Sequence, residues 1–332
     1  MDNYMKENEK LILEAEMISS AYKTYESNYF DTESYKQFKH TIIDHLPNDI
    51  IKKTTFTLYP KSQMLREGKY VIEKHFGNLD LKVPYADNDD LYSSVVAKFG
   101  KDPQPEQYDD IIKYINNQIK LVKVIDIPVY LSRDNIRAGG AIFDYIYAYS
   151  SKVSEFYKKV PMFLREIQLD GDCDDLTVPI YVHEMSHALI TRHKGNTKNL
   201  LNKEAFPIFM EKIAAIDLDP SGILLETMNL FRILNNKNAV IDKELNEFNE
   251  INFSQTIDDK TYLLSSLYAT ALFDLYLNGD DKLRNDIDID LGDVISGRGV
   301  LEDVLDYYEA TPEKGAKIMK KQIKNYHNKY FK

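Results

Sequence analysis

The stretch TVPIYVHEMSHALITRH, residues 177–193, decides how the rest of the chain is interpreted. Its pattern predicts a helix, because Thr177 can cap the first turn and Pro179 lies within that turn, where its missing N–H costs nothing. Gly195 follows two basic residues and is a typical stop signal. FLREIQLDGD, residues 163–172, alternates apolar and polar residues directly before it and predicts a strand. The sequence therefore predicts a strand, a turn and a mostly apolar helix in that order.

The five residues HEMSH, 183–187, lie on this predicted helix and have the spacing of metal ligands. Positions i and i+4 of a helix lie on one face, so the imidazoles of His183 and His187 can bind one metal ion. Glu184 lies next to them, where a carboxylate can hold a water molecule and take its proton. A catalytic zinc ion needs a third protein ligand and an open position. The motif therefore predicts a further ligand elsewhere in the chain.

The segment LNKEAFPIFMEKIAA, residues 201–215, offers that ligand. Glu204 and Glu211 are seven residues apart and so share one face of a helix. The alternative is that both are surface glutamates of an ordinary amphipathic helix. Pro207 requires either that the helix begins close to it or that the helix kinks there.

These motifs resemble those of the gluzincins, the zinc metallopeptidases with two His and one downstream Glu as ligands. HEMSHAL followed by EAFPIFME carries the resemblance, and within that clan the chain is most similar to the oligopeptidase F and thimet oligopeptidase family. EAFPIFME also resembles the matching stretch of the aminopeptidase N family. Further segments similar to the first family are YLSRDNIRAGGAIFD (130–144), the run from Met162 to His187, SSLYATALFDLYLNG (265–279) and VISGRGVLEDVL (294–305).

The resemblance implies a role for each matching residue. His183, His187 and Glu204 would bind Zn²⁺, Glu184 would act as the general base, and Glu211 would orient a ligand without touching the metal. The family binds the oxyanion with a late His and tyrosines, but this chain has no His between His193 and His327. The oxyanion candidates are therefore Tyr268, which matches the family motif best, and Tyr262.

The expected fold is mainly α with a small, largely antiparallel β-sheet, and by resemblance it is a zincin-like metallopeptidase fold. An N-terminal helical lobe, residues 1–125, would precede a catalytic lobe, residues 126–332. Helices are predicted at 9–24, 33–46, 142–159, 200–217, 222–235 and 261–278 and after Thr311, strands at 55–60, 122–132 and 163–172, and a glycine turn at 137–141. A peptide substrate would pair with a free edge of the strand at 163–170.

The composition limits the setting in which such a protein would work. The formal net charge is −11, which argues against nucleic acid or an anionic membrane as the general partner. The exception is the last 22 residues, which hold seven Lys and one Glu and most simply form a solvated helix face. The one cysteine, Cys173, suits a reducing compartment, and no signal-peptide core is visible. We therefore expect a cytoplasmic protein.

Taken together, the sequence predicts a zinc-dependent endopeptidase or oligopeptidase that hydrolyses short peptides. Two alternatives remain open. One is a metallopeptidase with a dedicated protein target, such as a regulator or a toxin, which fits the short chain. The other is a non-catalytic zinc- or peptide-binding protein that kept the ligands, which fits the missing late His.

Overall fold

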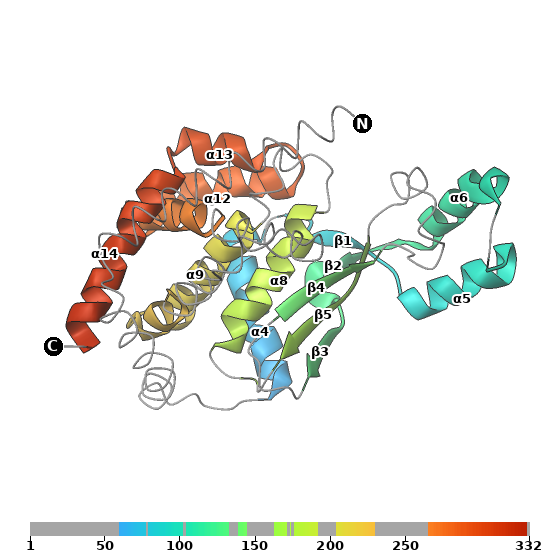
Figure 1. Ribbon diagram of the computed structural model, residues 1–332, viewed down its shortest axis with the longest axis horizontal. Helices are drawn as coiled ribbons and strands as arrows, with labels where there is room; N and C mark the ends of the chain where they lie inside the picture. Colours follow the sequence, from blue (N-terminus) through green and yellow to red (C-terminus); the bar gives the residue numbers. More distant parts are fainter. Residues whose placement is uncertain are drawn as a thin grey trace, which may run out of the picture. The chain divides into compact units, whose positions relative to one another are not determined.

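The computed structural model describes residues 60–132, 139–144, 163–191, 204–229 and 265–330, apart from 78, 102–103, 171–172 and 174–175. This part of the chain is mostly helical with one small sheet, as the sequence predicts (Figure 1). The predicted helices at 9–24 and 33–46 and all but the last residue of the predicted strand at 55–60 lie outside the described residues. Among the described residues, no helix is both long enough and apolar enough to cross a membrane.

The chain divides into two compact units. One unit holds residues 58–196 and 292–298 and contains the sheet, and the other contains the described parts of 197–291 and 299–332. The lobes expected from the sequence, 1–125 and 126–332, stay a prediction.

The sheet has five strands and is mixed. They are β1 (Lys82–Tyr85), β2 (Lys120–Lys123), β3 (Val129–Ser132), β4 (Gly139–Asp144) and β5 (Phe163–Asp170). The pairs β1–β2 and β4–β5 are antiparallel, as expected, whereas β1–β5 and β3–β5 are parallel. β4 follows β5 along one edge, while β1 and β3 pair with successive parts of β5, so β5 is the central strand.

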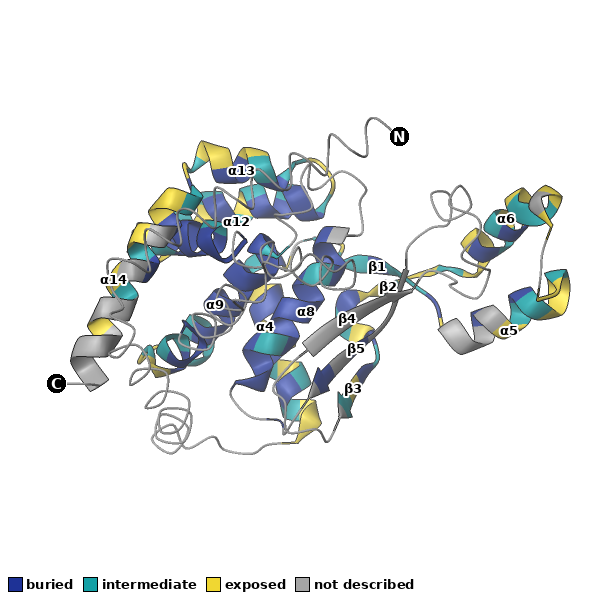
Figure 2. Cartoon of the chain, viewed as in Figure 1, coloured by how far each residue is buried: buried dark blue, intermediate teal, exposed yellow. Residues whose placement is uncertain are grey.

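Two helices of this unit, α4 (Lys61–Phe76) and α8 (Thr177–Thr191), pack against each other, and α8 also contacts β4 and β5. Their apolar side chains form a core with the sheet. The core residues with at most 1% exposure include Met64, Val71 and Ile72 of α4, Val83 of β1, Ile167 and Leu169 of β5, and Val178, Val182, Met185 and Leu189 of α8. Figure 2 shows α8 buried along most of its length.

A helical hairpin is inserted between β1 and β2. It consists of α5 (Asn88–Phe99), the 3₁₀ turn η1 (Pro105–Gln107) and α6 (Tyr108–Gln118), and it lies beyond one end of the two strands (Figure 1). It has a small core of its own, because Leu91 and Val95 of α5 are buried in one cluster with Ile111 and Ile115 of α6. A second 3₁₀ turn, η2 (Val124–Asp126), joins β2 to β3.

The described residues of the other unit form helices and the turns that join them, with no strand. It contains α9 (Ala205–Leu218), helical segments at 223–229 and 265–278, most of α12 (Asp281–Ile295), α13 (Leu301–Tyr307) and α14 (Pro312–Tyr330). The rings of Phe209 and Phe273 lie edge to face, with centroids 6.4 Å apart, and Tyr276 meets Phe209 in the same way at 5.6 Å. The segment 265–278 therefore packs against α9.

Three expectations about the sheet were wrong. The strand at 122–132 is interrupted, because η2 separates β2 from β3. Residues 139–144 form β4, so residues 139–141 of the predicted glycine turn and the first residues of the predicted helix at 142–159 are a strand instead. The remaining residues of these two predictions lie outside the described residues. β5 was expected to have a free edge, but it is paired on both sides. The glycine pair at 139–140 suggested a turn. The backbone is extended there because these residues pair with β5, which is distant in sequence.

Candidate metal centre

The helix that carries the HEMSH motif, α8, packs against α4 and also contacts β4 and β5. Its residues 177–179, 181–186 and 188–190 are all buried, which leaves few positions for solvent. On one side, Gly68 of α4 lies so close to Tyr181 that a Cβ atom at this glycine would be 2.5 Å from a carbon of the tyrosine ring. Burial raises the pKa of Tyr181, and the Asp126 carboxylate raises it further, so the hydroxyl stays neutral. The histidines therefore lie on a helix that is largely buried and closely packed against α4.

His183 and His187 come together as their spacing predicts. Their Nε2 atoms are 3.2 Å apart, and the two rings are inclined at 77° with centroids 4.8 Å apart. His183 is 5% exposed, and His187 is half-buried. In this arrangement one ring can donate its N–H to the other, and a metal ion at the same place would take a lone pair from each.

Glu184 lies on the same turn as His183 and is also 5% exposed. A carboxylate with so little solvent contact needs partners, and this side chain has an interaction within the structure. Glu184 directly follows His183 in the helix, and its role as the general base stays a prediction.

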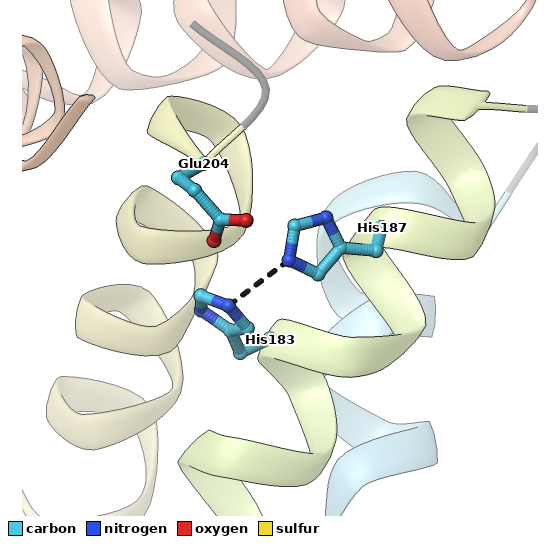
Figure 3. Close-up of side chains that lie close together, drawn as sticks. All are labelled: His183, His187 and Glu204. Carbon is cyan, nitrogen blue, oxygen red and sulfur yellow. Dashed lines mark hydrogen bonds between the residues drawn. The ribbon is translucent and has the colours of Figure 1, made fainter. Parts of the chain in front are cut away.

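Glu204 is the third residue of the ligand set. It is the N-cap residue of α9 and is half-buried. His183, His187 and Glu204 each offer one ligand atom, and these atoms lie within 4.8 Å of one another (Figure 3). The helix of Glu204 begins at Ala205, so Pro207 lies in the first turn and causes no kink. Of the two expectations for Pro207, the early helix start is confirmed.

The donor set fits a divalent metal of the zinc type. Two ligands at the usual Zn–N distance of about 2.0–2.1 Å in tetrahedral geometry are about 3.3 Å apart. The separation of the two Nε2 atoms is 3.2 Å and needs almost no adjustment. Two imidazoles and one carboxylate are also the ligand types of many catalytic zinc sites, in which a fourth position stays open.

Glu211 and the adjacent Lys212 are both buried in the middle of α9, with exposures of 0% and 4%. The ammonium of Lys212 donates to the amide oxygen of Asn229 and lies 5.8 Å from the centroid of the Phe273 ring. These contacts join α9 to two neighbouring helical segments and compensate the burial of a charge. Glu211 also has an interaction within the structure, so it is not a surface glutamate. Its role as an orienting residue stays a prediction.

Of the two tyrosines expected to bind an oxyanion, Tyr268 lies among the described residues. Tyr268 is half-buried on the helical segment 265–278 and has an interaction within the structure. Tyr262 lies outside the described residues. The oxyanion role of both residues stays a prediction.

Sequence reasoning missed two features of this region. The first is that β4 rather than β5 forms an edge of the sheet beside α8. The only local signal was the short apolar run at residues 141–143, which the preceding glycine pair obscured. The second is the buried pair of Lys212 and Asn229, which no local pattern indicates because its members are 17 residues apart.

Comparison of the chain with known proteins adds no assignment. No family model, no curated protein and no solved structure matches it.

Proposed function

We propose that this protein is a zinc-dependent peptidase of the gluzincin type with a zincin-like fold. The observation that carries the proposal is the pair of imidazoles on α8, whose Nε2 atoms are 3.2 Å apart, with the buried Glu184 between them in sequence. Glu204 supplies the third ligand. Zinc is inferred from the ligand types, because imidazole and carboxylate together suit this ion.

When bound, the zinc ion would act as a Lewis acid towards the scissile carbonyl and make water a better nucleophile. The chain's own residues do the rest. His183 and His187 present neutral Nε2 lone pairs, which requires that each ring carries its proton on Nδ1. Glu184 takes a proton from the attacking water and passes it to the leaving amine. Tyr268 or Tyr262 donates a hydrogen bond to the oxyanion.

The substrate would bind along β4 instead of β5. A peptide adds to a sheet only at a strand with unpaired N–H and C=O groups, and β5 has none available at its paired positions. Among the described strands, β4 pairs with β5 alone and contacts α8. The outer edge of β3 is less suitable, because its Val129 carbonyl already accepts a hydrogen bond from Lys61. The Gly139–Asp144 strand is therefore the proposed platform for an extended peptide.

The test compares the wild type with Glu184→Gln on a mixed peptide library, with bound zinc measured in both proteins. The glutamine keeps the size of the side chain but cannot accept the proton. We expect cleavage by the wild type alone, at equal zinc content. Equal cleavage by both proteins would disprove the role of Glu184. Cleavage by neither, with zinc bound to both, would favour a dedicated protein target or a non-catalytic zinc- or peptide-binding protein.

A further inference from the structure

The antiparallel pair of β1 and β2 leaves an open edge whose geometry follows from one hydrogen bond. The N–H of Val124 donates to the carbonyl of Leu81, just beyond the two strands, so these two residues form a hydrogen-bonded pair. Such pairs alternate with non-bonded ones in an antiparallel ladder. The pairs Lys82–Lys123 and Pro84–Leu121 are therefore non-bonded. The missing N–H of proline agrees with this assignment.

In non-bonded pairs the backbone groups point away from the partner strand. The N–H and C=O groups of Leu121 and Lys123 therefore point outward from β2, on the side opposite to β1. β2 is the last strand in the order of the sheet, and no other described strand pairs with this side. An open edge of this kind is a template for another extended chain.

The same register places two like charges directly opposite each other. Lys82 and Lys123 are cross-strand partners. Because the pair is non-bonded, its side chains are at the shorter of the two cross-strand distances, where like charges destabilise the sheet. Lys82 has an acidic neighbour, Asp80, at 3.5 Å, whereas no ion pair of Lys123 is found among the described residues. A chain with a net charge of −11 thus concentrates positive charge on this strand.

Next to this lysine pair, on the same face, lies an exposed apolar side chain. Leu121 is 67% exposed and shares the face of Lys82 and Lys123, because side chains alternate along a strand. Lys120 is exposed on the opposite face. The outer edge of β2 therefore offers free backbone groups, one apolar contact and a lysine at each end.

We propose that the outer edge of β2 binds an acidic, extended peptide segment of a partner protein. Such a strand would satisfy the outward N–H and C=O groups and offset the repulsion between Lys82 and Lys123. A lipid headgroup cannot donate to the carbonyls in a regular ladder, so a membrane fits less well. A second copy of β2 would bring further lysines to those already present. The proposal does not depend on the metal centre.

The register defines the sequence that should bind best. A partner strand that adds antiparallel to β2 places its residues, from its N-terminus to its C-terminus, opposite Lys123, Val122, Leu121 and Lys120 in that order. An acidic residue is expected at both ends and an apolar residue opposite Leu121, which gives the pattern acidic, any, apolar, acidic. The probe is a fluorescein-labelled peptide Thr-Glu-Thr-Val-Glu-Thr, and its charge control has Lys in place of both Glu residues.

Binding is measured by fluorescence anisotropy with the full chain at low and at physiological ionic strength. We expect the acidic peptide to bind at least about tenfold more tightly than the basic one, and the difference to shrink with salt. The double variant Lys120→Glu, Lys123→Glu should reverse the preference. Lys113→Glu, which changes an exposed lysine of α6, should leave it unchanged.

A backbone variant separates strand addition from simple charge attraction. Leu121→Pro removes one outward N–H without breaking a β1–β2 hydrogen bond, so it should weaken peptide binding while the thermal unfolding midpoint stays close to that of the wild type. Equal affinity for both peptides would overturn the proposal. Binding only to vesicles of phosphatidylcholine and phosphatidylserine, or self-association in sedimentation that the lysine variants abolish, would also overturn it in favour of a membrane or a second copy.

Discussion

The Nε2 atoms of His183 and His187 are 3.2 Å apart on consecutive turns of α8. This distance is close to the ligand–ligand separation of about 3.3 Å in a tetrahedral zinc site. Two rings at such a distance are held by their backbone, because α8 is packed against α4 and contacts β4 and β5. Folding of the chain therefore already brings these two ligands together, and a metal ion would not have to do so.

Glu204 and Glu211 should differ in their effect on metal binding. Glu204→Ala removes a proposed ligand, so most of the bound zinc should be lost after dialysis. Glu211→Ala should keep the metal at an affinity about 10- to 100-fold lower, because it would remove an orienting partner instead of a ligand. Elemental analysis and a competitive zinc titration measure both quantities. Wild-type zinc content in Glu204→Ala would rule out Glu204 as a ligand.

Tyr268→Phe should lower peptide turnover about 10²-fold or more with the metal retained, because the variant loses only the hydroxyl that would donate to the oxyanion. Tyr276→Phe is a matched control on the same helical segment. Its hydroxyl bonds to Asp288 at 3.4 Å, so this change should affect stability more than turnover. Turnover is measured with the best peptide from the library. An unchanged rate in Tyr268→Phe would leave Tyr262 as the candidate.

Gly68→Ala should destabilise the protein, although alanine is favoured over glycine in a helix by about 1 kcal/mol. The new Cβ atom would meet the Tyr181 ring at 2.5 Å, and such overpacking typically costs about 1–3 kcal/mol. Gly292→Ala in α12 is the control, because its Cβ would meet only the end of the Leu79 side chain at 3.3 Å. Urea unfolding should show a loss of stability for Gly68→Ala alone. A gain in both variants would contradict the tight packing of α4 on α8.

Asp219 should make stability depend on pH. Burial raises its pKa, but hydrogen bonds from Ser221 and Leu224 outweigh this effect and hold the pKa below its usual value of 3.8. The carboxylate therefore stabilises the fold above about pH 4, and this contribution is lost as the pH falls through the lowered pKa. Asp219→Ala should cost about 0.5–2 kcal/mol at pH 7, as for the loss of a helix cap.

The measurement for Asp219 is urea unfolding at pH 7 and at pH 3. The difference between Asp219→Ala and the wild type should be smaller at the lower pH. Asp306→Asn, at an exposed position of α13, serves as the control and should change stability little at either pH. A difference that stays constant between the two pH values would show that the charge of Asp219 is not the cause.

The sequence by itself determined the local features of this protein. The helix from Thr177, the strand from Phe163 and the juxtaposition of His183 with His187 all follow from patterns a few residues long, and the structure has all three. For Pro207 the sequence left two possibilities, an early helix start or a kink, and α9 has the early start. Such features depend on backbone geometry between near neighbours, which a short stretch of residues specifies.

Only the tertiary structure decided which strands become neighbours. β5 lost its expected free edge because β1, β3 and β4 pair with it, and the glycines at 139–140 became part of a strand through pairing with residues 168–169. The close approach of Gly68 to Tyr181 and the buried contact of Lys212 with Asn229 likewise join residues far apart in sequence. Pairing and burial depend on which surfaces meet when the whole chain folds, and no local pattern contains that information.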